Sequence, residues 1–192
     1  MTIANIITLA RLVFVPIIIW AMLSDAMLPA FVLFIVAGAS DAVDGIIARA
    51  FNQQSELGTI LDPLADKVML VSVFIVLTYL DHIPLWLTIL VVSRDMLIVV
   101  GFVICFMFDK PIDINPLRIS KANTVAQIAL ACFVMGSLAL SFENTLINSV
   151  LVWVTALLTA ISATAYTVQG IRHLAAEAKP IASQTDGNTL DM

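Results

Sequence analysis

The chain has 192 residues, of which 61% are hydrophobic and 12% are charged, with a formal net charge of −5 and a mean hydropathy of +1.05. Water-soluble domains carry about 25% charged residues, so this composition excludes an ordinary soluble domain. It also excludes a single membrane anchor, because the chain is too long and too apolar throughout. We therefore expect a one-domain integral membrane protein without a nucleic-acid partner.

Six apolar stretches are each long enough to cross a hydrocarbon core of about 30 Å, which takes roughly 20 helical residues. They cover residues 4–23, 28–49, 59–80, 84–107, 119–140 and 146–169. The alternating ten-residue segments of a membrane barrel are absent, so an all-α fold with six transmembrane helices is predicted. We expect a membrane domain at 1–175 and a disordered polar tail at 176–192, since the tail is low in apolar residues.

The basic residues predict the orientation. The connections near 24–27, 81–83 and 141–145 contain no Lys or Arg. The other connections and the C-terminus hold Arg49, Lys110, Arg118, Arg172 and Lys179. By the positive-inside rule, both termini are predicted to be cytoplasmic. The first stretch lacks the basic start and cleavage site of a secretory signal, so we expect a retained helix.

Four aspartates interrupt two of these stretches: Asp41 and Asp44 in the second, Asp62 and Asp66 in the third. A charged side chain at the centre of a membrane helix costs roughly several kcal/mol, unless it is paired, hydrated or bound to metal. The predicted topology places all four in the cytoplasmic half. The same half is predicted to hold the other charged side chains of the spans: Arg11, Arg94, Asp95, Arg118 and Lys121. Together they predict one polar cavity that opens to the cytoplasm.

The spacing of the aspartates indicates a metal site. Asp41 and Asp44 are three residues apart and Asp62 and Asp66 are four apart, so each pair shares one helix face. Four carboxylates in one cavity of low dielectric constant repel one another unless cations intervene. Oxygen ligands favour Mg²⁺ or Mn²⁺, and two such ions suit phosphoryl chemistry.

Two alternatives remain open at this point. The aspartates could form ion pairs inside the membrane with Arg11, Arg49 or Lys67. The chain could also be an ion-coupled transporter, because buried carboxylates mark cation pathways. A transporter predicts broken helices and related halves, and the sequence contains neither.

The pattern Asp41-x2-Asp44-Gly45-x2-Ala48-Arg49-x8-Gly58-x3-Asp62-x3-Asp66 resembles the signature of the CDP-alcohol phosphotransferase family at all eight specified positions. The resemblance implies transfer of a phosphatidyl group from CDP-diacylglycerol to an alcohol, with release of CMP. It implies that Asp41, Asp44 and Asp62 bind the metals, and that Asp66 lies close to them as general base. It also implies a homodimer. We expect a bacterial inner membrane protein whose active site, by the predicted topology, faces the cytoplasm.

The resemblance also assigns the binding site of the nucleotide. Gly45, Ala48 and Arg49 would hold the CMP moiety and its phosphates, and Gly58 would give clearance. The N-terminal segment with Asn5 and Thr8 resembles the family as well, which adds these two residues to the predicted CDP site.

The acceptor alcohol is predicted from a second polar group. The basic residues Arg94, Arg118 and Lys121 are expected to contact it, because cations can hold a phosphate. Asp95, next to Arg94, is expected to contact the acceptor as well. Snorkelling is the alternative for Arg118.

Three stretches, 61–67, 93–95 and 119–124, resemble the CMP-forming cardiolipin synthases of the family, whose acceptor is phosphatidylglycerol. Phosphatidylglycerophosphate synthases, which use glycerol 3-phosphate, more often carry a second lysine where Asn123 stands. One positive charge fewer favours phosphatidylglycerol, a phosphodiester, and glycerol 3-phosphate remains the alternative acceptor.

Overall fold

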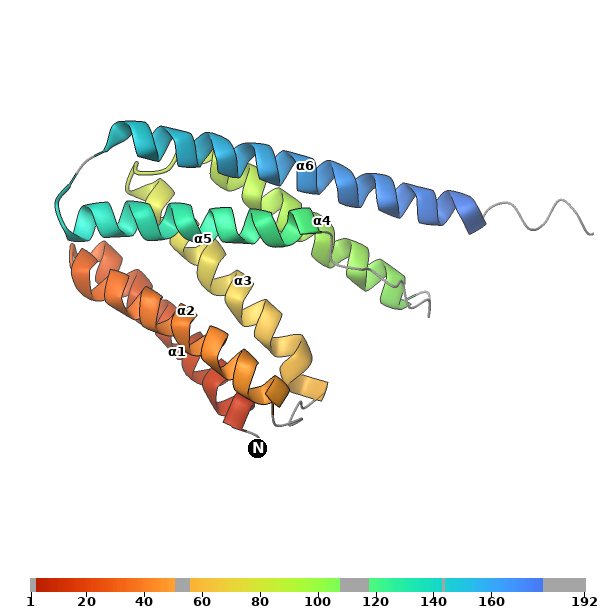
Figure 1. Ribbon diagram of the computed structural model, residues 1–192, viewed down its shortest axis with the longest axis horizontal. Coiled ribbons are helices and arrows are strands. Elements are labelled where there is room, and N and C mark those ends of the chain that lie inside the picture. Colours follow the sequence, from red (N-terminus) through yellow and green to blue (C-terminus); the bar gives the residue numbers. More distant parts are fainter. Residues whose placement is uncertain (1–2, 51–55, 108–117, 143, 178–192) are drawn as a thin grey trace, which may run out of the picture.

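A computed structural model describes the backbone of residues 3–50, 56–107, 118–142 and 144–177, and the side chains of 13–40, 67–100, 119–142 and 144–168 (Figure 1). The described backbone forms helices joined by turns, without strands. The helices are α1 (Ile3–Leu23), α2 (Met27–Ala50), α3 (Glu56–Tyr79), α4 (Leu85–Met107), α5 (Arg118–Ala139) and α6 (Thr145–Glu177). The all-α prediction is therefore confirmed for this part of the chain, and each of the six apolar stretches is a helix.

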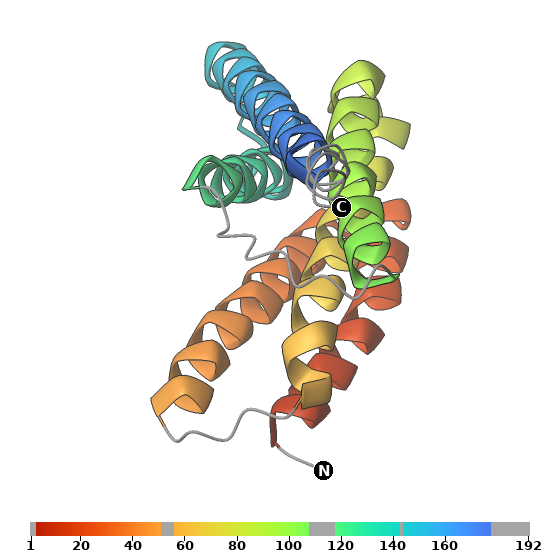
Figure 2. The same ribbon diagram turned by 90° about the vertical axis from the view of Figure 1, so that its right-hand side faces the viewer.

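The helices pack as two groups that share one end. In one group α1 contacts α2 and α3, and in the other α6 contacts α4 and α5. The groups are joined by contacts of α2 with α5 and of α3 with α4 and α5. Toward the end where α2 finishes and α3 begins, α1, α2 and α3 run away from α5 and α6 (Figures 1 and 2). Most of the described interior is apolar, and its largest fully buried apolar side chains are Phe74, Ile18, Met22, Leu77, Leu87, Leu130 and Met135.

Three short connections close the shared end, which we call the connection end: 24–26, 80–84 and 140–144. Asp25, Asp81 and Ser141 adopt left-handed φ angles of 57°, 60° and 53°. The next residue in each case donates its backbone N–H to a carbonyl five residues earlier, as in the bond of 2.9 Å from Ala26 to Ala21. This is the Schellman arrangement that ends a helix and satisfies its last carbonyl groups. This arrangement lets the chain reverse its direction within a few residues and begin the next helix.

The last helix is longer than predicted. α6 has 33 residues and ends at Glu177, whereas the apolar stretch was expected to end at 169. Its length of about 50 Å, at 1.5 Å per residue, exceeds the thickness of a hydrocarbon core. The apolar composition predicts where the hydrophobic part of the helix ends. The helix itself continues beyond that point, through residues that are polar but favour a helical backbone. Of the predicted tail, 176–192, Ala176 and Glu177 belong to α6, and the residues from 178 onward lie outside the described residues.

The outer surface of the bundle is apolar. Trp20 on α1, Met96 on α4 and Leu157 on α6 are 70%, 60% and 61% exposed, and every helix carries further large apolar side chains on its surface. Contiguous apolar surface of this kind is rare on soluble monomers. Two helical segments, Ile119–Ala139 and Thr145–Val168, meet the length and composition needed to cross a membrane, among the residues that could be tested.

Candidate functional site

The eight-position motif lies on two helices. Asp41 and Asp44 are in the last turns of α2, and Asp62 and Asp66 are in the first half of α3. The helical register therefore puts each pair on one face of its helix, as the spacing predicted. Gly45, Ala48 and Arg49 follow on α2, and Gly58 precedes on α3.

Topology brings the two aspartate pairs to the same end of the bundle. α2 runs away from the connection end, and α3 begins where α2 has finished and runs back (Figure 1). We call this opposite end the charged end. The side chains of the motif lie outside the described residues, and so do those of Asn5 and Thr8 on α1 and of Arg118 at the start of α5.

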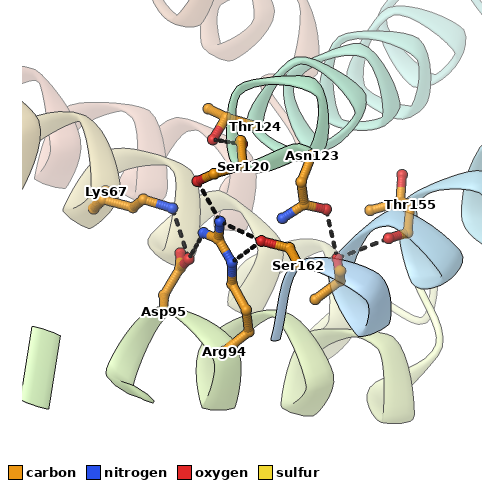
Figure 3. A network of polar contacts seen from close by, with 9 residues as sticks. Lys67, Arg94, Asp95, Ser120, Asn123, Thr124, Thr155 and Ser162 are labelled. Carbon is orange, nitrogen blue, oxygen red and sulfur yellow. Dashed lines mark hydrogen bonds and ion pairs between the residues drawn. The ribbon is translucent and has the colours of Figure 1, made fainter. Parts of the chain in front are cut away.

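Toward the charged end, Arg94 of α4 binds three other residues (Figure 3). Its Nη1 donates to Asp95 Oδ1 over 2.6 Å, and its Nη2 donates to Ser120 Oγ of α5 over 2.6 Å. Nη2 and Nε also donate to Ser162 Oγ of α6, over 2.8 and 3.1 Å. Its guanidinium carbon lies 5.8 Å from the centre of the Tyr166 ring. Arg94 is 2% exposed. Its hydrogen bonds to Ser120 and Ser162 link α4 with α5 and α6.

One carboxylate oxygen of Asp95 forms ion pairs with two cations. Its Oδ1 accepts a hydrogen bond from Arg94 and another, also 2.6 Å long, from Nζ of Lys67 on α3. Its Oδ2 is buried and has no hydrogen-bond partner among the described groups. The side chain of Lys67 is 32% exposed, whereas that of Arg94 is 1% exposed. Of the two cations, Lys67 is the one that a ligand can reach.

Lys67 was not among the predicted site residues. The sequence places it directly after Asp66, where it was considered as an ion-pair partner of the aspartates. Its described partner is Asp95, 28 residues away on another helix. The ion pair of Lys67 with Asp95 thus also brings α3 against α4.

Asn123 lies at the interface of α5 and α6, on the side of Arg94 away from Lys67 (Figure 3). It is fully buried, and its Oδ1 accepts a hydrogen bond of 2.7 Å from Thr159 Oγ1. Gln127, one turn further along α5, is also fully buried and lacks a hydrogen-bond partner among the described groups. Lys121, by contrast, is exposed. Of the predicted acceptor residues, Arg94 and Asp95 form an ion pair with each other, whereas Lys121 makes none of the hydrogen bonds of their network.

A cavity of about 500 Å³ lies between α2, α3 and α5. Its lining is apolar except for Lys67 and Thr124, and the full set is Phe34, Ile35, Gly38, Ala39, Lys67, Met69, Leu70, Thr124, Ile128 and Cys132. A Cβ atom added to Gly38 would meet nothing within 4 Å. The volume falls within the range of about 300–1,000 Å³ that is typical of ligand pockets.

The predicted metal site falls on the four motif aspartates, whose side chains lie outside the described part. The side chains that are described contain no group of His, Cys, Asp or Glu that could hold a metal ion. The residue types of the motif nevertheless fit a hard divalent cation, because it has four aspartates at two same-face register positions on each of α2 and α3.

The described part of the chain is thus an all-helical bundle with an apolar exterior and a charged end, and comparison with known proteins defines its class. A family model described as CDP-alcohol phosphatidyltransferase matches residues 1–161, which include the whole motif. The chain belongs to the CDP-alcohol phosphatidyltransferase family.

Its relatives include two kinds of synthase. The chain is 32% identical over 184 residues to "Cardiolipin synthase (CMP-forming)" of Rattus norvegicus, which covers 86% of this chain and 60% of that protein. The Homo sapiens protein of the same name is 30% identical with the same coverage. A "Probable phosphatidylglycerophosphate synthase" of Mycobacterium tuberculosis is 37% identical over 99 residues, 48% of this chain and 47% of the relative. The chain thus spans about 60% of the length of the first two relatives.

Proposed function

We propose that this protein transfers a phosphatidyl group from CDP-diacylglycerol to phosphatidylglycerol, forming cardiolipin and releasing CMP. The observation that carries the proposal is the complete eight-position motif on α2 and α3, within a chain that the family model matches over residues 1–161. Two of the relatives that align with 86% of the chain are named "Cardiolipin synthase (CMP-forming)". A relative from Oryza sativa with the same coverage is named for transfer to glycerol 3-phosphate. Membership of the family leaves the transporter alternative without support.

We further propose that all six helices cross the membrane. Each has at least 21 residues, about the length that a hydrocarbon core requires. Exposed apolar side chains cover the bundle, in keeping with a lipid environment. The basic connections favour cytoplasmic termini and a charged end that faces the cytoplasm. We propose the inner membrane of a bacterium as its location.

Asp41, Asp44, Asp62 and Asp66 would hold two ions of Mg²⁺ or Mn²⁺, because carboxylates are the ligands these ions prefer and each pair occupies one face of its helix by register. When bound, such ions offset the negative charge of the pyrophosphate and of the leaving CMP. Arg49 would add a fixed positive charge beside the phosphates. The small residues Gly45, Ala48 and Gly58, together with Asn5 and Thr8, would shape the site of the CDP group.

Asp66 would act as the general base. The acceptor oxygen forms a bond to the phosphorus atom that carries the diacylglycerol, and the bond from that phosphorus to the oxygen of CMP breaks. The proton of the attacking hydroxyl moves to the Asp66 carboxylate, and the electron pair of the broken bond leaves with CMP. No covalent enzyme intermediate is required.

A second candidate is a phosphatidylglycerophosphate synthase, which would use glycerol 3-phosphate as its acceptor. The Mycobacterium tuberculosis relative favours it. The apolar cavity beside Lys67 offers space for an acyl chain of a lipid acceptor, which glycerol 3-phosphate lacks, although the donor CDP-diacylglycerol of both reactions has acyl chains as well. Arg118 and Lys121 would contribute positive charge around either acceptor, and the proposed active form is a homodimer.

The test is the release of CMP from CDP-diacylglycerol by the purified protein, with Mg²⁺ or Mn²⁺ and each acceptor supplied separately. We expect release with phosphatidylglycerol. Release with glycerol 3-phosphate but not with phosphatidylglycerol would select the second candidate. Release with neither acceptor would refute the proposed function.

A further inference from the structure

The described ion network around Asp95 has two cations and one carboxylate. Lys67 and Arg94 share one carboxylate oxygen of Asp95. The donors of Arg94 are occupied by Asp95, Ser120 and Ser162. Among these three groups Lys67 is the accessible cation, and a cation that shares its carboxylate in an environment of low dielectric constant favours a further anion.

The space that Lys67 faces is apolar. Lys67 lines the cavity between α2, α3 and α5, and the other lining residues carry no charge. The ligand that matches this arrangement has a single negative charge next to a hydrocarbon chain. A phosphodiester lipid has both, whereas a free phosphomonoester has the wrong charge and no chain.

We propose that Lys67 binds the phosphodiester of the acceptor phosphatidylglycerol, with an acyl chain of the same molecule in this cavity. The inference rests on the proposed function and names the binding site of its lipid acceptor. Lys67 directly follows Asp66 on α3. A phosphodiester held by Lys67 therefore lies at the same turn of α3 as the proposed base.

Asp95 positions Lys67. Its Oδ1 accepts hydrogen bonds from both Lys67 and Arg94. Asp95 is 7% exposed and does not line the cavity. It therefore holds the Lys67 ammonium group beside the cavity. Arg94 is a positioning residue here, since it holds Asp95 and does not face the cavity.

The first test replaces the cation. Lys67→Gln should raise the KM for phosphatidylglycerol by about tenfold or more, the usual worth of a hydrogen bond to a charged group, and leave the KM for CDP-diacylglycerol unchanged. Lys67→Arg keeps the charge and should restore most of the affinity. Both constants are measured in mixed micelles, each with the other substrate at saturation, and the melting temperature of each variant shows whether it is folded.

The second test fills the cavity. Gly38→Leu places a side chain into space where a Cβ meets nothing within 4 Å, so the helix has room for it. It should raise the KM for long-chain phosphatidylglycerol and leave that for a dihexanoyl analogue unchanged. Val36→Phe is the matched control: Val36 is 49% exposed on the same helix and does not line the cavity. It should change neither constant.

The assignment is overturned if Lys67→Gln turns over phosphatidylglycerol with an unchanged KM. It is also overturned if the KM for CDP-diacylglycerol rises instead, since Lys67 would then bind the donor lipid. Both outcomes leave the proposed function standing, because the unsubstituted protein still releases CMP with phosphatidylglycerol. If the unsubstituted protein releases none, the proposed function and this inference fail together.

Discussion

The two ends of the helix bundle are held together in different ways. At the connection end, three Schellman turns reverse the chain within a few residues, and their hydrogen bonds are local in sequence. At the charged end, side chains far apart in sequence join α3, α4, α5 and α6 through Lys67, Asp95, Arg94, Ser120 and Ser162. One end is closed by backbone geometry, and the other is built from polar contacts in which a ligand can take part.

Their cavities differ in the same way. The cavity at the connection end has a volume of about 460 Å³ and is bordered by Asp81, His82 and the paired rings of Trp86 and Trp153, whose centres are 5.6 Å apart. Tryptophan of this kind is typical of the membrane–water interface. The cavity toward the charged end is apolar with one accessible cation. The comparison therefore predicts that substitutions at the charged end change catalysis and that those at the connection end change stability alone.

The largest expected effect is at the motif. Asp66→Asn removes the proposed general base, so CMP release should fall by at least about 100-fold. Asp44→Asn, which removes a proposed metal ligand, should do the same. Circular dichroism and gel filtration should be unchanged, since neither substitution alters the helix pattern. Substantial turnover in both variants would contradict the assigned chemistry.

The next effect is on the buried network. Arg94→Met leaves Ser120 and Ser162 without their donor, and removal of one partner from a buried ion pair costs about 3–5 kcal/mol. We expect a clearly lower melting temperature in detergent. Lys121→Gln, which removes an exposed cation from α5, serves as the stability control and should melt close to the unsubstituted protein. Equal melting of both variants would show that the network does not hold the charged end together.

The smallest effect is at the connection end. Ser141 has a φ of 53°, a conformation that costs about 1–2 kcal/mol for a residue with a Cβ. Ser141→Gly should therefore raise the free energy of unfolding by up to about 1 kcal/mol and leave CMP release unchanged. Ser141→Ala keeps the Cβ and should give no such gain. A change in turnover would break the division between the two ends.

Much of the fold could be predicted because the helices are apolar and their ends carry local signals. Helix starts and ends fell within about three residues of the apolar stretches, except at α6, where polar residues extend the helix to Glu177. The spacing likewise predicted that Asp41 and Asp44 share one face of α2 and that Asp62 and Asp66 share one face of α3.

The polar network in which we propose the acceptor site could be predicted less well, because it depends on contacts between helices. The sequence shows Lys67 next to Asp66, but its described ion pair is with Asp95 on α4. Arg94 was expected to face the acceptor, and the partners that bury it, Ser120 and Ser162, come from two other helices. Asn123, used to infer the acceptor from charge, packs against Thr159 and does not line the cavity.

The central claim is that the acceptor is a lipid, and one reaction tests it most directly. The purified protein is given CDP-diacylglycerol, a divalent metal, and equal amounts of phosphatidylglycerol and glycerol 3-phosphate, and the products are identified by mass spectrometry. We expect cardiolipin whose head group and two acyl chains come from isotope-labelled phosphatidylglycerol. Phosphatidylglycerophosphate as the product, without labelled cardiolipin, would contradict the account.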